Sequence, residues 1–589
     1  MSAGILRAED RPRAETSALA LDAPILAELI RKEHAAPFWL RGEPEFTRVE
    51  QELRQYAGSG ATADEILTQM LRMIAVVGDG HTMLAGSDRY QQLGIAPFFA
   101  EIFDDGVYLV KLPESESALL GAKILAVGGA SIESALDRLR AFVPHSNESR
   151  FRRWAHSYLH LPGLMHALGL SDSPSSIDLT LRTIDGEVVH ESFVRMTLEQ
   201  YRETNREELA WPETRRDRKA GTNYFYEPIP EDDAVYFNFR RVANADSGET
   251  IWAFGARLAS HLEENTVDRL VIDLRENGGG GYQYAAHLRP LLASVPSLDR
   301  PGGIVILTGP KTFSAASDFL SQMQRFTHAT LIGVPPGGSI GEPGDDDDFT
   351  LPNTGLTVRI SQVAGRDAAS VDRRRVVRVD VPVPDRFADR MAGRDAALDA
   401  ALAFEPAPET LDARALTNAA WAGRYAFEPG SDLVIRERNG FWRATALPQM
   451  DTPLAALGPG RARAGIPGLD LVLDERRDGV RLIFADGSEQ FCARKASDEP
   501  SAWDLVFAGR IAEATPLLRE ALEQNPDSPS LTDGAFTSEA IHLTFTLSRT
   551  MDGRTARLKA RELLETSIAI HPGGAPESEF SLRFYPKPE

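Results

Sequence analysis

The stretch that decides the fold is Val271-Ile272-Asp273-Leu274-Arg275-Glu276-Asn277-Gly278-Gly279-Gly280-Gly281, an apolar strand that runs directly into four glycines. A second apolar strand (303–308) follows and leads to a turn of small residues that contains Ser314. Glycines leave backbone N–H groups uncovered, so such a loop can donate hydrogen bonds to a ligand oxygen. A serine beside that loop supplies the nucleophile that acyl transfer needs. These two segments therefore predict where a functional site would lie.

Composition limits the classes of protein to which the chain can belong. Its 589 residues are too many for one hydrophobic core, so we expect several domains. The formal net charge of −22 argues against nucleic acid or an anionic membrane as a main partner, because both require a basic surface. The only cysteine, Cys492, excludes an intrachain disulfide and a cysteine-based metal cluster.

Targeting and membrane segments are not visible in the sequence. No apolar run approaches the length of about twenty residues that spans a bilayer, so we expect no membrane insertion. The N-terminal segment 1–24 is interrupted by charges and lacks the apolar core of a secretory signal. The sequence therefore predicts a cytoplasmic protein, or a periplasmic one if a signal has been removed.

Changes in periodicity divide the chain into five predicted parts. Helical patterns with apolar faces occupy the first part, and short alternating strands the second. Strands and helices then alternate, which predicts an α/β core. Short strands separated by turns, and finally helices, follow a proline-rich link at 405–409. The predicted parts are 1–90 (helical), 91–205 (short strands), 206–405 (α/β core), 410–498 (small all-β domain) and 499–589 (helical tail).

Two of these parts resemble known modules. The strand Ala122–Val127, the turn Gly128-Gly129 and a helix from Glu133 resemble a PDZ domain, which binds an extended peptide at a sheet edge. The tail, with Ala508-Gly509-Arg510 and Asn525-Pro526, resembles a tetratricopeptide-type hairpin. One or two hairpins are too few for a solenoid, so we expect a capping or docking role for the tail.

Four short motifs in the order of the chain carry a more specific resemblance. They are Gly78-Asp79-Gly80-His81-Thr82, Asp273-Leu274-Arg275-Glu276-Asn277-Gly278-Gly279, Thr312-Phe313-Ser314-Ala315-Ala316-Ser317-Asp318 and Val381-Pro382-Val383-Pro384-Asp385. Together they resemble the C-terminal processing (tail-specific) serine peptidases, a family that includes the tricorn protease core. The resemblance covers about residues 40–405, and it implies a crotonase-like α/β core with serine peptidase activity.

The resemblance also distinguishes between two chemical types within that family. One type pairs its serine with a downstream lysine, but Gly337–Gly341 occupy that place here and no lysine follows Lys311 within the core. The tricorn-like type uses histidine as the base, and His81 matches that position. Histidine suits this task because its ordinary pKa near 6.5 leaves it largely neutral at pH 7. The chain therefore resembles the Ser/His branch more closely.

The family motifs assign a role to each candidate residue. Ser314 is the expected nucleophile, although serine is also a common helix N-cap and Ser317 lies one turn further on. His81 is the expected base. Backbone N–H groups of Gly278 or Gly279 and of Ala315 are expected to form the oxyanion hole.

The group that orients His81 is left open by the sequence. Glu342 and Asp380 are the candidates, and Glu342 is included in the predicted catalytic set. The run Asp345-Asp346-Asp347-Asp348 could suggest a cation site, but ligands for calcium usually alternate with spacers. A solvated acidic loop is the better interpretation of this run, and no metal is predicted.

Two other functions fit part of the sequence. A peptide-binding scaffold without activity would explain the missing lysine. Gly337-Gly338-Ser339-Ile340-Gly341 also fits the G-x-S-x-G elbow of esterases, with Ser339 as nucleophile. That elbow requires a strand before it and a helix after it, whereas Pro335-Pro336 precede and Glu342-Pro343-Gly344 follow.

The sequence as a whole predicts a serine endopeptidase that cleaves peptide or protein substrates through an acyl-enzyme. This chemistry requires no metal, nucleotide or organic cofactor. A homo-oligomer is possible, and nothing in the composition decides it.

Overall fold

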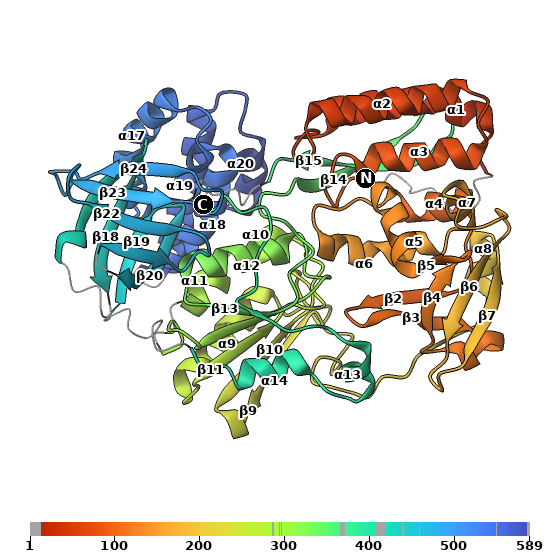
Figure 1. The fold of residues 1–589 in the computed structure, drawn as a ribbon. Coiled ribbons are helices and arrows are strands. Elements are labelled where there is room, and N and C mark those ends of the chain that lie inside the picture. The colour runs from red at the N-terminus through yellow and green to blue at the C-terminus, as the bar shows by residue number, and fades with distance from the viewer. Residues whose placement is uncertain are drawn as a thin grey trace. The chain divides into compact units, whose positions relative to one another are not determined.

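The computed structural model describes residues 13–285, 288–293, 295, 297–365, 371–406, 419–438, 441–458, 460–548 and 551–585 (Figure 1). The chain forms two compact units, which are treated separately below. The first unit comprises Met1–Arg218, Glu342–Gly365 and Pro384–Ala396, and the second comprises Lys219–Gly341, Arg366–Val383 and Ala397–Glu589. Residues 1–12 of the predicted N-terminal segment and residues 407–409 of the predicted link lie outside the described residues.

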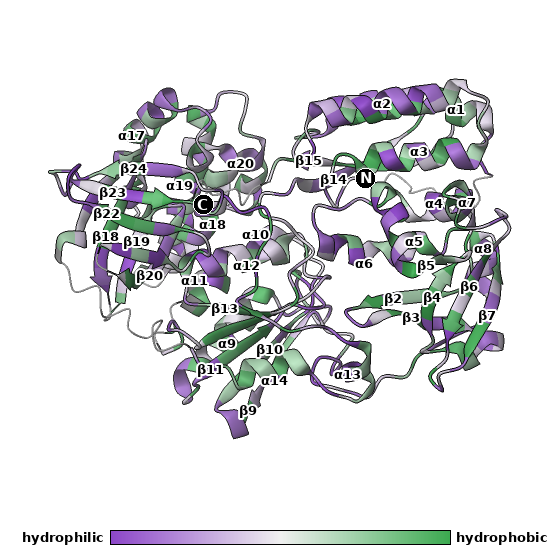
Figure 2. Cartoon of the chain, viewed as in Figure 1, coloured by the Kyte–Doolittle hydropathy of each residue, from purple (hydrophilic) through white to green (hydrophobic). Residues whose placement is uncertain are grey.

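Three amphipathic helices begin the first unit: α1 (Thr16–Glu33), α2 (Glu43–Gly58) and α3 (Ala63–Ala75). The start of α3 is fixed by a capping box, in which the Thr62 side chain accepts from Glu65 N–H and the Glu65 carboxylate accepts from Thr62 N–H. Most of α2 is hydrophilic and only three of its side chains, Phe46, Val49 and Leu53, are buried (Figure 2). The predicted helical part is therefore held by one apolar face of each helix.

An antiparallel sheet in the order β2-β3-β4-β6-β7 follows these helices in the first unit. Helices α5 (Ile132–Leu139) and α6 (Glu148–Leu159) lie between its strands in the sequence. Its strands are β2 (Phe99–Phe103), β3 (Gly106–Pro113), β4 (Lys123–Val127), β6 (Ser176–Arg182) and β7 (Val188–Val194), with β5 (Ala130–Ser131) and β8 (Arg206–Glu208) paired beside them. One hydrophobic cluster runs from α3 through this sheet, so the predicted parts 1–90 and 91–205 share a core.

A hairpin from much later in the chain completes the first unit. Its strands β14 (Gly344–Thr350) and β15 (Thr357–Val363) pair with each other, and β15 pairs with the short strand β1 (Met83–Leu84). Leu356 and Val358 of this segment join the cluster that contains α3. The sequence predicts this segment within the α/β core, whereas the structure places it in the first unit beside the loop that carries His81.

The second unit contains the predicted α/β sheet, in the order β16-β13-β12-β11-β10-β9. Its strands are β9 (Tyr224–Ile229), β10 (Ala234–Phe239), β11 (Arg269–Asp273), β12 (Ile304–Thr308), β13 (Thr330–Gly333) and β16 (Val381–Pro382). All neighbouring pairs are parallel except β9 with β10. The central strands are buried on both faces and hydrophobic (Figure 2), as parallel strands generally are.

Parallel pairing determines where the two predicted motifs lie. The glycine loop follows β11, and the Ser314 turn follows β12, its direct neighbour in the sheet. Helices α9 (Ile251–Glu264) and α12 (Ala315–Phe326) connect the parallel strands. Because the carboxyl ends of parallel strands meet at one edge of a sheet, the loop and the turn lie side by side.

An eight-stranded antiparallel meander follows the core, where the small all-β domain is predicted. Its strands are β17 (Gly423–Glu428), β18 (Ser431–Arg438), β19 (Phe441–Ala446), β20 (Met450–Gly458), β21 (Arg461–Ala464), β22 (Asp470–Asp474), β23 (Gly479–Ile483) and β24 (Glu489–Ala493). A bridge between Tyr425 and Arg494 brings its two ends together, so the sheet is nearly a closed barrel. Its interior is a separate hydrophobic cluster that includes Trp421, Leu433 and Leu482.

Helices end the chain, in the region predicted to be a helical tail. They are α16 (Ala502–Phe507), α17 (Ile511–Gln524), α18 (Asp533–Ser548), α19 (Gly553–Ile570) and α20 (Pro576–Ser581). The tail contacts the α/β core through α18, because Ser538 Oγ lies 2.7 Å from Tyr282 Oη and His542 Nδ1 lies 2.9 Å from Arg289 Nη2. Within the described residues, no helix is both long enough and apolar enough to cross a membrane.

Candidate active site

The glycine loop of the second unit is held rigidly from both sides. Asn277 is fully buried, and its Nδ2 donates to Phe239 O (2.9 Å) while its Oδ1 accepts from Gly279 N–H (2.9 Å). Val242, which follows β10, donates to Gly279 O and accepts from Gly281 N–H, each at 2.9 Å. The loop therefore has one defined conformation.

Ser314 has a backbone conformation that is rare for a residue with a side chain. Its φ is 53° and its ψ is −133°, at the residue immediately before α12, and its side chain makes no capping hydrogen bond. Such strained conformations cluster at functional sites, and a sharp turn between a strand and a helix is the geometry of a nucleophile elbow. The alternative interpretation of Ser314 as a plain N-cap is therefore not supported by this geometry.

The glycine loop approaches this turn so closely that no side chain fits between them. A Cβ built on Gly279 would lie 2.7 Å from Ser314 Cβ, 2.8 Å from Phe313 O and 3.1 Å from Ala315 N. Gly279 also has a φ of +102°, which residues with a Cβ rarely adopt. Glycine at position 279 is thus what allows the loop to lie against the nucleophile turn.

The N–H groups beside Ser314 differ in their availability. That of Gly279 already donates to Asn277 Oδ1, so the prediction that it serves as an oxyanion donor needs correction. Gly278 is exposed at the tip of the loop, and space around its Cα is open. Ala315 is the first residue of α12, where an N–H group has no acceptor within the helix and the helix dipole favours negative charge. Gly278 and Ala315 are therefore the candidate donors.

The C-terminal tail supports the same loop. Tyr282, directly after the four glycines, shares its hydroxyl with Ser538 Oγ of α18 (2.7 Å) and with Gln322 Nε2 of α12 (2.7 Å). One hydroxyl thus ties the glycine loop to the nucleophile helix and to the tail. The sequence contained no signal for this contact, because Tyr282 and Ser538 are 256 residues apart.

His81 lies in the first unit, in a loop organised around the buried carboxylate of Asp79. Asp79 Oδ1 accepts from His81 N–H (2.7 Å) and Thr82 N–H (2.5 Å), and Oδ2 accepts from Thr82 Oγ1 (2.9 Å). His34 Nδ1 accepts from Ala36 N–H, so its Nε2 carries the proton that is donated to Asp79 Oδ2 at 2.6 Å. Burial would raise the pKa of Asp79, but His34, His81 and these backbone donors lower it overall. Asp79 therefore stays ionised and holds the loop.

The surroundings of His81 favour the neutral form of its imidazole by lowering its pKa. Burial lowers its pKa and the Arg150 guanidinium lowers it further, and these effects exceed the opposing effects of Asp79, Asp346 and a hydrogen bond to the backbone of Pro343. Proline has no backbone N–H, so the Pro343 partner is its carbonyl, which accepts from the ring. The segment 342–344 thus contacts His81, and a Cβ on Gly344 would lie 3.3 Å from His81 Cε1.

Glu342 lies at this loop but bonds to its backbone. Its Oε1 accepts from Gly80 N–H (2.6 Å) and its Oε2 from Ser146 Oγ (2.8 Å), while Arg150 Nη2 donates to Gly80 O (2.6 Å). The predicted role of Glu342 therefore changes from orienting the imidazole directly to positioning Gly80, the residue before His81. Sequence reasoning did not identify His34, Ser146 or Arg150, because none lies in a motif.

The remaining candidates lie elsewhere. Asp380 is in the second unit, where its Oδ2 accepts from Leu331 N–H at the start of β13 (2.8 Å). Ser339 is 5% exposed, forms an isolated antiparallel bridge with Val376, and is not followed by a helix. Residues 345–348 belong to β14, and Asp346 and Asp348 form ion pairs with Arg359 of the neighbouring strand β15. No group of three potential metal ligands is present among the described residues.

Comparison with known proteins adds little to this geometry. No protein-family model matches the chain, and no curated protein matches it. Similar solved structures include mature CPAF (13% identity, TM-score 0.46, covering 66% of this chain and 96% of that one). CPAF complexed with lactacystin (12%, 0.45, 64% and 96%) and a Bacteroides fragilis protein assigned to the S41 proteases (14%, 0.27, 64% and 96%) are also similar. At these values the likeness decides neither fold nor function.

The close approach of Gly279 to Ser314 gives a first test. Gly279→Ala should lower any activity that depends on Ser314 by about a hundredfold or more, because the new Cβ displaces the nucleophile turn. Gly221→Ala, in the same unit but outside the proposed site, is the control, since its added Cβ would meet no atom within 4 Å. Reaction rates with a fluorophosphonate and circular dichroism of both variants measure this difference. Equal rates for the two variants would contradict the proposed contact.

The charge next to His81 gives a second test. A general base acts in its neutral form, so kcat/KM should fall only when the pH drops below the lowered pKa of His81. Asp346 raises this pKa, so Asp346→Asn should move the acidic limb of the pH profile to still lower pH. Asp348→Asn, on the same strand and paired with the same Arg359, is the control that should leave the limb in place. A shift to higher pH in Asp346→Asn would exclude His81 as the titrating base.

Proposed function

We propose that the protein is a serine endopeptidase with Ser314 as nucleophile and His81 as general base. The observation that carries this proposal is the strained turn at Ser314, at the start of α12 and in contact with Gly279 of a rigid glycine loop. This arrangement places Ser314 against the glycine loop and at the start of a helix, where a hydroxyl and nearby backbone N–H groups would support attack on a carbonyl and stabilisation of its oxyanion. We also propose that the α/β core is of the crotonase-like type that the motifs imply.

In the first half of the proposed reaction, Ser314 Oγ attacks the carbonyl carbon of the scissile peptide bond. A C–O bond forms while the Oγ proton passes to His81, and the negative carbonyl oxygen accepts hydrogen bonds from Gly278 and Ala315. The C–N bond then breaks, His81 returns the proton to the leaving amine, and an ester of Ser314 remains. Removing one oxyanion donor of this kind typically costs about two to three powers of ten in turnover.

Water completes the proposed reaction. His81 removes a proton from a water molecule that attacks the ester carbon, and the C–O bond to Ser314 breaks as the proton returns to Oγ. A carboxylic acid leaves, so the net reaction is hydrolysis of one peptide bond. His81 can act twice as a base because its pKa is lowered and its ring is neutral before each attack.

His81 and Ser314 belong to different units, so their pairing is itself part of the proposal. What supports it is that each residue is prepared for its role within its own unit. Asp79, Glu342 and the Pro343 carbonyl hold the His81 loop, and the Pro343 bond can orient the ring as the third member of a triad does. Ser314 is held in a strained backbone conformation, and the glycine loop packs against it through Gly279.

The alternative of an esterase centred on Ser339 has little support in the geometry. Ser339 is buried, and it lacks the positive φ that Ser314 has and that a nucleophile elbow requires. Gly338, before it, packs against Ser317, because an added Cβ would lie 2.2 Å from Ser317 Oγ. The segment therefore serves as a packed connection after β13. An inactive scaffold with the same fold is the other alternative.

A fluorophosphonate probe separates these functions. Wild-type protein should be labelled at Ser314, with labelling lost in Ser314→Ala and lowered by about two to four powers of ten in His81→Ala. Ser317→Ala and Ser339→Ala are the controls that should retain labelling, and mass spectrometry of the labelled peptide identifies the site. Folded protein without any labelling would favour the scaffold, and label lost only in Ser339→Ala would favour the esterase.

We also propose that the PDZ-like part, 91–205, captures an extended segment of the substrate. Deleting it is a poor test, because it shares one hydrophobic core with α3 and with residues 351–360. A peptide that carries a benzophenone at one end, incubated with the Ser314→Ala protein and irradiated, should instead cross-link within 91–205. Cross-links confined to the α/β core, or unchanged by excess unmodified peptide, would contradict the capture role.

A further inference from the structure

A cavity of about 620 Å³ lies within the second unit, between the α/β core and the barrel. Its core side comprises Pro301, before β12, Thr330, at the start of β13, and Asp380, before β16. These positions are at the amino ends of parallel strands, whereas Ser314 follows a carboxyl end. The cavity is therefore at the edge of the sheet opposite the candidate active site, and it belongs to no function described above.

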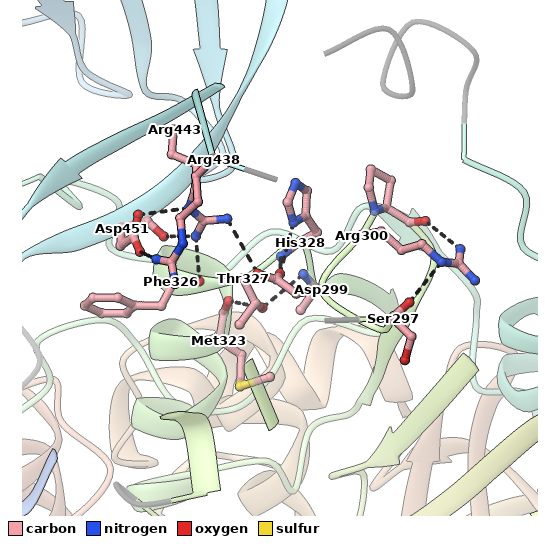
Figure 3. Close-up of polar contacts among 12 residues, drawn as sticks. Ser297, Asp299, Arg300, Met323, Phe326, Thr327, His328, Arg438, Arg443 and Asp451 are labelled. Carbon is pink, nitrogen blue, oxygen red and sulfur yellow. Dashed lines mark hydrogen bonds and ion pairs between the residues drawn. The ribbon is translucent and has the colours of Figure 1, made fainter. Parts of the chain in front are cut away.

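Polar contacts fix the two walls relative to each other (Figure 3). Arg443 of β19 lies between Asp451 of β20 and Asp299 of the core, with Nε 2.9 Å from Asp451 Oδ1 and Nη1 3.5 Å from Asp299 Oδ2. Its Nη2 also donates to Phe326 O (3.1 Å), at the end of α12. The barrel is thus bound to the core by buried charge, and the cavity beside this joint has defined walls.

Asp380 places a carboxylate in this cavity. Leu331 N–H donates to its Oδ2, and within the described residues Asp380 forms no ion pair. Asp380 is exposed to solvent as a residue, yet the protein around its carboxylate raises its pKa, an effect that Leu331 and the more distant Arg374 only partly offset. Asp380 therefore offers an accessible carboxylate with which a cation in the cavity can pair.

His328 lines the same cavity and contributes a second acceptor. Its Nδ1 and its backbone N–H both lie 3.0 Å from Asp299 Oδ1, so the ring proton is on Nδ1 in the neutral form (Figure 3). The side chain is 6% exposed, and its Nε2 is buried without a hydrogen-bond partner. A hydrogen-bond donor on a ligand would stabilise the buried lone pair of His328 Nε2.

Apolar side chains line much of the rest of the cavity, and the charged side chains of Arg463 and Asp470 in its barrel wall pair with each other. Phe404 comes from the core side, and Pro453, Ile483 and Phe484 come from the barrel. The volume lies within the range of about 300–1,000 Å³ that small-molecule sites occupy, with few polar groups among apolar walls. With its ring proton on Nδ1, His328 presents an acceptor at Nε2, as Asp380 does at its carboxylate, so the cavity favours a ligand that donates hydrogen bonds.

We propose that this cavity binds a small organic amine, with its ammonium group paired to Asp380, a further donor directed to His328 and its apolar body against Phe404, Pro453 and Phe484. The acidic protein as a whole, with a net charge of −22, also attracts cations. The site is separate from Ser314, so binding can be measured whether or not the protein hydrolyses peptides.

Calorimetric titration of the full chain with three probes of similar size tests this assignment. 2-Phenylethylamine should bind about tenfold or more tightly than 2-phenylethanol or 3-phenylpropanoate, because only the amine forms a charged pair with Asp380. Asp380→Asn, which retains an acceptor for Leu331 N–H, should lower the affinity for the amine to that for the alcohol. Asp185→Asn, at an exposed turn of the first unit, is the matched control and should bind as the wild type does.

A second variant tests the place of binding independently of charge. Ala485 is an exposed residue of the cavity wall, and Ala485→Phe should abolish binding of both the amine and the alcohol while Asp380 is unchanged. The assignment is overturned if the amine binds no better than the alcohol to wild-type protein. It is also overturned if Asp380→Asn keeps the full affinity, or if Ala485→Phe binds as the wild type does.

Discussion

The candidate active site depends on the contact between Gly279 and the turn at Ser314. A strained backbone conformation persists only where the surroundings hold it, and here Asn277, Val242 and Tyr282 fix the loop that packs against the turn. The same contact brings the glycine loop against Ser314 and the backbone nitrogen of Ala315. Residues of the core, the loop and the tail thus hold the same short stretch of backbone in place.

In the first unit, buried charged side chains hold the loop that carries His81. His81 lies in a loop that contains Gly78 and Gly80, and the buried carboxylate of Asp79 holds this loop by accepting from its backbone and from His34. Hydrogen bonds to a carboxylate are stronger than those between neutral groups, especially away from water. Glu342 and Arg150 repeat this pattern at the two sides of Gly80. The cost of burying these charges is offset because each has several partners.

The two edges of the parallel sheet have different chemistry. Its carboxyl edge presents backbone N–H groups, which suit an anion that forms during a reaction. Its amino edge, closed by the barrel, presents the acceptors Asp380 and His328 in an apolar cavity, which suit a cation. Strands β12 and β13 each extend from one edge to the other within a few residues.

Local patterns in the sequence were sufficient to predict the strand, loop and turn that carry the candidate site. The apolar strand at 271–273, the four glycines and the small residues after Thr312 predict a strand, a loop and a turn, because each depends only on neighbours in the chain. Tertiary structure alone decided which partners these residues have. Glu342 contacts Gly80 across 262 positions, Ser361 contacts Asp79 across 282, and the hairpin 344–363 joins the first unit. Such contacts arise from the packing of distant apolar faces and the pairing of buried charges, neither of which leaves a periodic signal along the chain.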